Sequence, residues 1–296
     1  MDEPVLLTGA AGRVADAILA DLADAYTWRL LDRDPPAGEP AHEYVVADVT
    51  DKQAVREAMT GVGAVIHLAG DPRPEASWDS VLVNNVDGTK TVLDAAASAG
   101  VEKCVLASSN HAVGGYETDE RVPDIYRSHD AYRLDGTELP RPGNFYGVSK
   151  ATAELLARYY YDTQGLSTVC LRIGNLTRER PPADYERGQA MWLSYRDCAH
   201  LFDRCLRAEY DYEIVYGISD NDRKYYSIDR ARTVLGYDPQ DNSEDFDSDP
   251  EFESESDGDP DTDSDGDPGH APAPGSGSGP NVGSPPGSGS GPGDDR

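Results

Sequence analysis

Basic residues are scarce in this sequence, and lysine is especially rare. The chain has 26 lysine and arginine residues against 55 aspartate and glutamate residues, a formal net charge of −29, and only five of the 26 are lysines. Such an excess repels nucleic-acid phosphates and anionic membrane surfaces, so we expect neither as a partner. An acidic, lysine-poor surface is typical of a salty cytosol, where salt screens the self-repulsion. An acidic protein from an ordinary cytosol is the plainer alternative.

Long hydrophobic runs are missing, and cysteines are few. No stretch is long and apolar enough to span a bilayer, and the first residues, MDEPVLL, lack the basic and apolar segments of a signal peptide. We therefore expect a cytoplasmic protein. The four cysteines, Cys104, Cys170, Cys198 and Cys205, do not have the close spacing of a metal site. Buried, reduced thiols and no bound metal are expected.

Short apolar runs alternate with helical patterns along the first 174 residues. The runs occupy 4–8, 27–32, 43–48, 64–70, 102–109 and 167–174, and the helical patterns end near Ala23 or span 52–60, 79–99 and 146–163. Regular alternation of this kind indicates a parallel sheet with helices on both faces. The sequence therefore predicts an α/β fold, a doubly wound parallel sheet of Rossmann type, over residues 1–174.

The pattern changes after Gly174 and again near residue 243. We expect a long loop at 175–191, then a capping box from Ser194 to Asp197 that opens a helix ending near Ala208, a strand at 213–217 and a helix at 227–235. Residues 175–242 are predicted to form a small substrate-binding lobe over the carboxyl ends of the strands. Residues 243–296, rich first in alternating acidic residues and then in Gly, Ser and Pro, predict a disordered tail.

A glycine-rich segment directly follows the first predicted strand and opens the first helix. It reads Thr8-Gly9-Ala10-Ala11-Gly12-Arg13-Val14-Ala15. Gly9 permits a tight turn, Gly12 lets the backbone approach a pyrophosphate, and Ala15 allows close packing of helix and strand. The helix N-terminus, with Arg13 and Val14, supplies donors for the phosphates. The segment predicts a dinucleotide-binding site.

Residues at the ends of the next strands extend this predicted site. Asp32 ends the second strand, where a carboxylate binds the adenosine ribose hydroxyls and repels a 2′-phosphate, so NAD is favoured over NADP. Arg33 is an opposing feature, because an arginine can accept that phosphate. Asp48 and Val49 are placed to frame the adenine, and three residues after the fourth strand are placed to pass beneath the cofactor: Leu68, Ala69 and Gly70.

A second motif, Tyr146-Gly147-Val148-Ser149-Lys150, begins the helix after the fifth strand. Residues four apart project from one face of a helix, so the phenol of Tyr146 and the ammonium of Lys150 are expected side by side. A neighbouring cation favours the phenolate and lowers the pKa of Tyr146 toward the range of a general base. Ser109 ends the fifth strand, and its hydroxyl can hold a substrate oxygen. A turn or helix cap is the alternative role of Ser109.

The glycine turn, the serine and the Tyr-x-x-x-Lys pair occur in the order typical of extended short-chain dehydrogenases/reductases, and residues 4–240 resemble that family of sugar epimerases, dehydratases and dehydrogenases. The resemblance implies that Tyr146 is the catalytic base. It implies that Lys150 lowers the pKa of Tyr146 and binds the nicotinamide ribose, and that Ser109 orients the substrate. It also places Asn84 or Asn85 near the cofactor. The family's third glycine is Ala15 here.

Narrower resemblances concern the substrate. Residues 107–111, 172–175 and 192–194 are similar to segments of uronate dehydrogenases, which oxidise the anomeric carbon of a hexuronic acid. Longer segments, such as RLDGTELPRP and YERGQAMWLSYRDC, resemble the NAD-dependent glucose-6-phosphate dehydrogenases of halophilic archaea. These resemblances imply a sugar phosphate oxidised at C1, with Arg187 at the C6 anion and Arg178 and Arg180 either beside it or on an ordinary solvated loop. They imply substrate contacts at Ser109, Asn110, His111, Asn175 and Arg187, with Asn175 replacing a serine.

Other functions stay open at this point. A uronate dehydrogenase is the first alternative, because both substrates are pyranoses with an anion at C6. A nucleotide-sugar epimerase or dehydratase is disfavoured, because those enzymes hold their substrate in a larger C-terminal lobe than residues 175–241 can form. The complete Ser-Tyr-Lys set speaks against a non-catalytic NAD-binding regulator. The sequence leaves the oligomeric state open, with a homo-oligomer among the alternatives.

Overall fold

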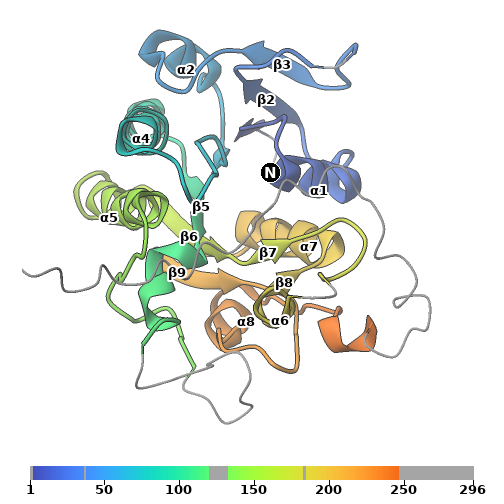
Figure 1. Ribbon diagram of the computed structural model, residues 1–296. Helices are drawn as coiled ribbons and strands as arrows, with labels where there is room; N and C mark the ends of the chain where they lie inside the picture. Colours follow the sequence, from blue (N-terminus) through green and yellow to red (C-terminus); the bar gives the residue numbers. More distant parts are fainter. Residues whose placement is uncertain (1–2, 37, 120–132, 183–184, 247–296) are drawn as a thin grey trace, which may run out of the picture. The chain divides into compact units, whose positions relative to one another are not determined.

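A parallel sheet of seven strands is the centre of the computed structural model, which describes residues 3–36, 38–119, 133–182 and 185–246 (Figure 1). The strands are β1 (Val5–Thr8), β2 (Trp28–Asp32), β3 (Glu43–Val46), β4 (Ala64–His67), β5 (Lys103–Ser109), β6 (Ser167–Ile173) and β9 (Tyr212–Gly217). Their order across the sheet is β3-β2-β1-β4-β5-β6-β9. Strands β1, β4 and β5 are buried along their whole length, which is why their sequences are mostly apolar rather than alternating.

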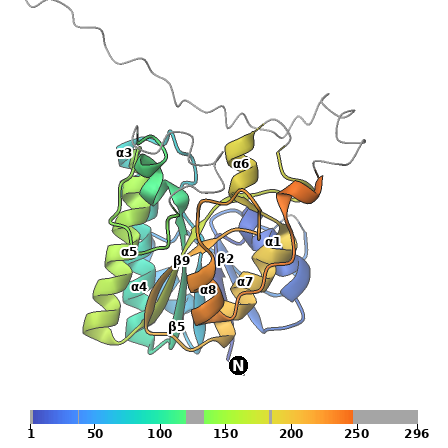
Figure 2. The ribbon, with the colours of Figure 1, turned by 90° about the horizontal axis from the view of Figure 1, so that it is seen from below.

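Helices cover both faces of this sheet (Figures 1 and 2). Helices α1 (Arg13–Leu22), α7 (Tyr195–Arg207) and α8 (Asp229–Leu235) lie on one face, and α2 (Lys52–Ala58), α4 (Gly88–Ala99) and α5 (Phe145–Gln164) on the other. Each face has its own core: Ile18 and Phe202 are buried in the first, Val55 and Val92 in the second. The predicted doubly wound α/β fold is confirmed.

Residues 175–191 differ from the expected long loop. They contain β7 (Asn175–Leu176) and α6 (Glu186–Ala190), and β7 pairs with β8 (Trp192–Leu193) in a small second sheet. A two-residue strand has no periodicity of its own, so only its pairing partner defines it. Only half of the predicted capping box is present: Ser194 Oγ accepts a hydrogen bond from the Asp197 N–H at 3.0 Å, but the Ser194 N–H donates to Ser219 Oγ instead of to the Asp197 carboxylate.

Part of the predicted lobe, residues 175–242, belongs to the main sheet. Strand β9 pairs with β6, and α7 contributes Leu201 and Phe202 to the same core as α1. The remaining elements of this region, β7, α6 and β8, follow the carboxyl end of β6 in the chain. A substrate-binding role for residues 175–242 stays a prediction.

The cysteines and the helices bear on two predictions from the sequence, buried thiols and the absence of a membrane-spanning segment. All four cysteines are buried and free, as predicted, and burial raises the pKa of the Cys104 thiol to about 12. Cys198 and Cys205 lie in α7 and face one core. Within the described ranges, none of the helices combines the length and the apolar character needed to cross a bilayer.

The ordered chain extends past residue 243, where the sequence predicts the start of the tail. Residues Ser243–Phe246 form a short 3-10 helix, η3. Ser243 is buried, Glu244 Oε1 lies 2.7 Å from Arg223 Nε, and the ring of Phe246 packs edge-on against Trp192 with centroids 5.5 Å apart. These four residues therefore pack on the domain. Residues 247–296, the rest of the predicted tail, lie outside the described residues.

We expect two truncated proteins to differ in stability. Removing residues 247–296 should leave Tm and kcat nearly unchanged. Removing residues 243–296 should cost about 2 kcal/mol, because the ring of Trp192 loses its aromatic partner and Arg223 its carboxylate. Thermal denaturation of both proteins in the same high-salt buffer measures the difference. Equal Tm values of the two truncated proteins would show that η3 contributes nothing. A Tm lower than that of the full-length chain in the protein that lacks only residues 247–296 would show that these residues dock on the domain.

Candidate active site

The strand order reverses between β1 and β4, and the predicted cofactor residues gather at this point. The chain runs from β1 to β2 and β3 on one side of the sheet and returns through β4 on the other. Ligands of open α/β sheets bind in the crevice that this reversal leaves at the carboxyl ends of the strands. Gly9 has φ of 76°, and a Cβ there would lie 2.7 Å from the amide nitrogen of Ala69. The turn after β1 therefore approaches the loop after β4 as only glycine allows.

Asp32 and Asp48 lie where the sequence places them, at the ends of β2 and just after β3. Asp32 Oδ2 accepts the Ala11 N–H at 2.9 Å, and Oδ1 accepts the Asp34 N–H at 3.0 Å, so the carboxylate is held beside the glycine turn. Asp48 accepts hydrogen bonds from the backbone and hydroxyl of Thr50, which lower its pKa. Val49, next to Asp48, is buried.

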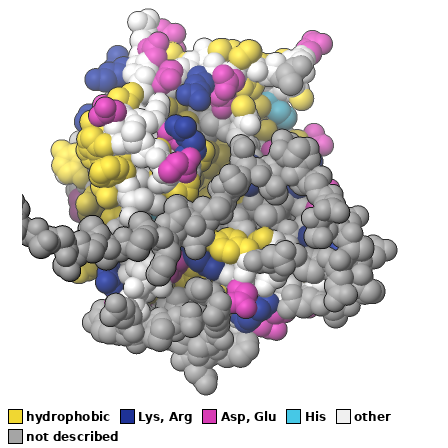
Figure 3. All heavy atoms as spheres, viewed as in Figure 1, with side chains coloured by type: hydrophobic (Ala, Val, Ile, Leu, Met, Phe, Trp, Pro, Cys, Tyr) yellow, Lys and Arg dark blue, Asp and Glu magenta, His cyan; other side chains and the backbone are white. Residues whose placement is uncertain are grey.

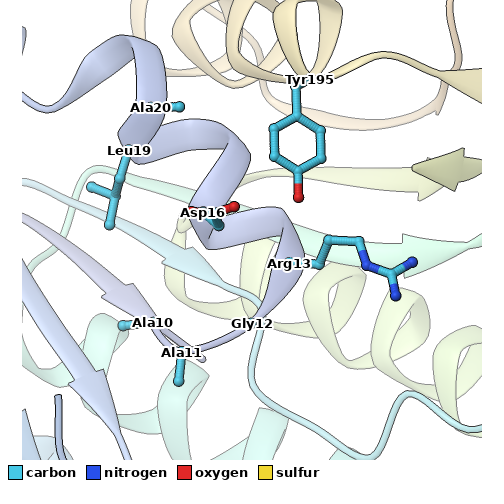
Figure 4. Close-up of a pocket in the computed structure, with 8 residues that line it drawn as sticks. All are labelled: Ala10, Ala11, Gly12, Arg13, Asp16, Leu19, Ala20 and Tyr195. Atoms are coloured by element: carbon cyan, nitrogen blue, oxygen red, sulfur yellow. The ribbon is translucent and has the colours of Figure 1, made fainter. Parts of the chain in front are cut away.

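A surface hollow of about 540 Å³ lies on the outer side of the glycine turn, between α1 and α7 (Figure 4). The Tyr195 hydroxyl points toward Asp16 and Arg13 there, and Arg13 reaches away from α1 to donate to the Leu176 carbonyl at 3.4 Å. Arg178 forms an ion pair with Asp16 and lies over the Tyr195 ring. The structure therefore places Arg178 beside the glycine turn.

The predicted helix at 79–99 is interrupted by a π-helix, in which Asn84 and Asn85 differ in their contacts. It consists of α3 (Trp78–Val81), the π-helix η1 (Leu82–Asp87) and α4. Asn85 Oδ1 accepts the Asp71 N–H at 2.7 Å, and Nδ2 donates to Ser149 Oγ at 2.9 Å. Asn84 instead donates to the Ser80 carbonyl of its own helix. Asn85 thus joins the loop after β4 to the helix of Tyr146, and π-helices of this kind are frequent at functional sites.

The predicted catalytic residues are together at the start of α5. Asn144 caps this helix through the Gly147 N–H, at 2.7 Å. Tyr146 is half-buried, and Ser109 at the end of β5 is close enough to lower the pKa of its hydroxyl. Lys150 Nζ lies 5.6 Å from the centroid of the Tyr146 ring and donates to the Ala107 carbonyl at 2.8 Å. The expected arrangement of a phenol, an ammonium and a hydroxyl is therefore present.

The pKa of Tyr146 differs from the expectation. Loss of solvent around the hydroxyl raises it to about 12, the hydrogen bond to Ser109 lowers it, and the carboxylate of Asp71 raises it further. Burial also lowers the pKa of Lys150 to about 8, against the charge of Glu154. The spacing placed Lys150 beside the Tyr146 ring as expected, but burial is the largest influence on the pKa of Tyr146, and a sequence pattern does not report burial at this level.

Three of the predicted substrate residues, Ser109, Asn110 and His111, follow one another at the end of β5, and His111 contacts Tyr146. Ser109 Oγ lies 3.1 Å from Asn110 Oδ1 and accepts the His111 N–H at 3.2 Å. The His111 ring packs edge-on against the Tyr146 ring, with centroids 5.5 Å apart. Met191 links Asn110 and Asn175, because its sulfur accepts from Asn110 at 3.2 Å and its carbonyl accepts from the Asn175 N–H at 2.9 Å. The strand end, β7 and α6 therefore meet at one place.

Arg187 lies on α6 and is already paired. Its Nε donates to Glu117, whose carboxylate also accepts from the Tyr226 hydroxyl, and its Nη1 donates to the Tyr185 hydroxyl at 2.7 Å. Burial opposes the charge of Arg187, but Glu117 outweighs it and raises the pKa of the guanidinium. Sequence reasoning missed Glu117, because it lies 70 residues from Arg187 and no local pattern joins them.

Comparison with known proteins agrees with this geometry. A model of the NAD dependent epimerase/dehydratase family matches residues 5–208. The chain is 69% identical to the NAD-dependent glucose-6-phosphate dehydrogenase of Haloferax volcanii over 252 residues, 83% of this chain and 96% of the relative. It is 37% identical to a uronate dehydrogenase of Pseudomonas putida over 246 residues, 82% of this chain and 85% of the relative.

A solved structure extends the likeness to three dimensions. The crystal structure of a uronate dehydrogenase variant from Agrobacterium tumefaciens, complexed with NAD, is similar with a TM-score of 0.73 and 32% identity, covering 88% of this chain and 92% of that one. The family match and these relatives confirm the resemblance on which the site residues were chosen. The chain belongs to the NAD dependent epimerase/dehydratase family.

Proposed function

We propose that this chain is an NAD-dependent glucose-6-phosphate dehydrogenase, which oxidises C1 of β-D-glucose 6-phosphate to 6-phosphoglucono-1,5-lactone. The observation that carries the proposal is the 69% identity to the Haloferax volcanii enzyme over 96% of its length. The meeting of Ser109, Tyr146 and Lys150 supports it, because these groups can hold and deprotonate a sugar hydroxyl. An assay of NADH absorbance with a panel of free and phosphorylated sugars in high salt tests it.

The crevice between β1 and β4 fits NAD. Gly9 adopts the positive φ of a tight turn, and Gly12 begins α1 without a side chain between the helix N-terminus and a phosphate. Gly12, Arg13 and Val14 would hold the pyrophosphate, Asp32 the adenosine ribose, and Lys150 the nicotinamide ribose. The remaining cofactor contacts that we propose are Asp48, Val49, Leu68, Ala69, Gly70 and Asn85. Bound NAD supplies the acceptor for the hydride that leaves C1.

Proton transfer is the part of the reaction that the chain itself performs. Ser109 holds the anomeric oxygen, and Tyr146 accepts its proton while the C1–H bond breaks and the C1=O bond forms. With the pKa of Tyr146 near 12, the phenolate needs a neighbouring positive charge to be populated at neutral pH. Lys150 supplies that charge below its own pKa of about 8.

Cofactor preference is expected to depend on Asp32. Asp32→Asn keeps an oxygen for the Ala11 N–H but removes the charge that repels a 2′-phosphate. We expect the ratio of kcat/KM for NAD to that for NADP to fall by roughly tenfold or more, and Asp32→Ala to lower it as well. Asp34→Ala, which removes a neighbouring exposed carboxylate, is the matched control. Equal efficiency of the wild type with both cofactors would defeat this assignment.

A uronate dehydrogenase is the second candidate, and one observation favours it. Arg178 pairs with Asp16 on α1, so of these two arginines we propose Arg187 alone for the C6 anion. A single guanidinium is sufficient for the carboxylate of a uronate, while a phosphate dianion gains from more than one. The 37% identity to the uronate dehydrogenase is well below the 69% to the glucose-6-phosphate enzyme, so we place this candidate second.

With this function we propose a cytoplasmic enzyme of carbohydrate metabolism in a salty cell, acting as a homo-oligomer. Large apolar side chains are exposed on α3, η1 and α5, namely Trp78, Val83, Phe145, Leu155 and Tyr159. In Figure 3, hydrophobic side chains gather at the left of the view, where Figure 1 labels α4 and α5. Such a patch is suited to contact with a second copy of the chain, and light scattering in high salt measures the oligomeric state.

A further inference from the structure

Three successive residues at the end of β5 contact three successive turns of α5. Ser109 acts on the Tyr146 hydroxyl, whose pKa it lowers, the Ala107 carbonyl accepts from Lys150 Nζ at 2.8 Å, and Ser108 Oγ donates to Glu154 Oε1 at 2.6 Å. The helix residues are spaced by four, so they lie on one face of α5. Two of the three contacts hold the residues already assigned to the reaction. The third holds Glu154, which neither the sequence motif nor the proposed reaction includes.

Glu154 is a buried carboxylate in an ion pair. Its side chain is 2% exposed, and both of its oxygens accept from Arg172 of β6, at 2.9 Å from Nε and 2.9 Å from Nη2. Arg172 is fully buried and also donates to the Tyr216 hydroxyl at 3.2 Å. Burial opposes the charge of Arg172, but the hydrogen bonds and charge of Glu154 outweigh it and raise its pKa. The field of such a pair acts on any nearby group.

Lys150 is the nearby group, one turn before Glu154 on the same helix. It is 9% exposed, with the Tyr146 ring above it and the Ala107 carbonyl as its hydrogen-bond acceptor. From β4, His67 faces the same space, but burial and the charge of Lys150 lower its pKa to about 3, so it carries no charge at neutral pH. Asp71 acts on Tyr146 from the loop after β4. Glu154 is the carboxylate whose charge favours the ammonium form of Lys150 against burial.

We propose that Glu154 is a positioning residue for the reaction, whose carboxylate, held by Arg172 and Ser108, keeps Lys150 in its ammonium form beside Tyr146. The inference rests on the proposed function only for the role of the ammonium, which is to favour the phenolate of Tyr146. The electrostatic relation itself rests only on contacts within this chain. Ser108 and Arg172 differ in their effects, because Ser108 orients the carboxylate without carrying charge, whereas Arg172 opposes the field of Glu154 at Lys150.

The sign of each substitution follows from this arrangement. A lysine is charged below its pKa and neutral above it, so any change that lowers the pKa of Lys150 removes the ammonium at lower pH. Glu154→Gln removes a negative charge and leaves Arg172 positive, so the titration of Lys150 should move down by about one pH unit or more. Arg172→Met leaves Glu154 negative and should move it up. The double variant, Glu154→Gln with Arg172→Met, should titrate between the two single variants.

The test is an NMR titration of protein labelled with ¹⁵N at the lysine side chains. The chain has five lysines, and comparison with Lys150→Arg assigns the signal of Lys150. Ser108→Ala is the matched control, because it removes one hydrogen bond from the same carboxylate and no charge, and the titration should stay near that of the wild type. If Glu154→Gln does not fold, because it leaves the buried Arg172 with only the more distant carboxylate of Glu138, 3.5 Å from Nη1, the upward shift in Arg172→Met carries the test.

Two results would overturn the inference. One is an unchanged Lys150 titration in folded Glu154→Gln or Arg172→Met, and the other is a shift in Ser108→Ala as large as that in Glu154→Gln. The titration uses neither sugar nor NAD, so it is independent of the substrate assignment. A wild type that fails to oxidise glucose 6-phosphate would defeat the proposed function alone. For active proteins, the high-pH limb of kcat should move in the same direction as the titration of Lys150.

Discussion

Tyr146→Phe is expected to lower kcat with glucose 6-phosphate by about 10² or more, while the affinity for NAD stays nearly unchanged. The substitution keeps the ring that packs against His111 and lies over Lys150 Nζ. It removes the hydroxyl whose pKa Ser109 lowers and which is proposed to accept the proton of the anomeric hydroxyl. Steady-state rates give kcat, and quenching of protein fluorescence by NADH gives the affinity for the cofactor.

Tyr159→Phe is the matched control, since Tyr159 lies on the same helix with its side chain exposed to solvent. It should retain the kcat of the wild type. A Tyr146→Phe enzyme with nearly normal turnover would show that another group takes the proton. A parallel loss of turnover and NADH affinity would mean that the substitution disturbs the crevice rather than the chemistry.

Glucose 6-phosphate is expected to be used with a kcat/KM about 10² times that for glucuronate or for free glucose, as guanidinium groups bind phosphate oxygens through charge-assisted hydrogen bonds. Arg187 is the cation that we propose for the C6 anion, since Arg178 pairs with Asp16 on α1. A phosphate carries close to two charges at neutral pH and a carboxylate one, so the preference should be largest where the sugar lacks an anion altogether. A higher kcat/KM with glucuronate than with glucose 6-phosphate would overturn this assignment and favour a uronate dehydrogenase.

Arg187 needs a paired design, because Arg187→Ala leaves Glu117 buried without its ion-pair partner. We expect KM for glucose 6-phosphate to rise roughly 10- to 100-fold in Arg187→Ala and in the double variant Arg187→Met with Glu117→Gln, since both lose the charge-assisted hydrogen bonds to the anion. KM for NAD should change little in either. Arg178→Ala, which affects an exposed arginine paired with Asp16, is the control. Recovery of normal KM in the double variant would show that Arg187 only balances the charge of Glu117.

The sequence alone was sufficient for features that depend on neighbours along the chain. The apolar runs predicted the buried parallel strands because strands covered on both faces have no polar side. The positions of Gly9, Gly12 and Asp32 predicted a turn and a strand end, and the structure has both there. The spacing of Tyr146 and Lys150 predicted one helix face, because successive turns of a helix repeat nearly every four residues. Each of these features is set by local backbone geometry.

The tertiary structure decided which distant groups meet and how strongly burial acts on them. Only the π-helix distinguishes Asn85 from Asn84, and only packing joins Arg187 to Glu117 and Glu154 to Arg172. The order of the strands brings β5, β6 and α5 together, and no spacing along the chain encodes the resulting contacts. Burial, which depends on the whole fold, raises the pKa of Tyr146 although the motif predicted the opposite. Sequence patterns report periodicity and residue type, whereas charge interactions and desolvation depend on three-dimensional distance.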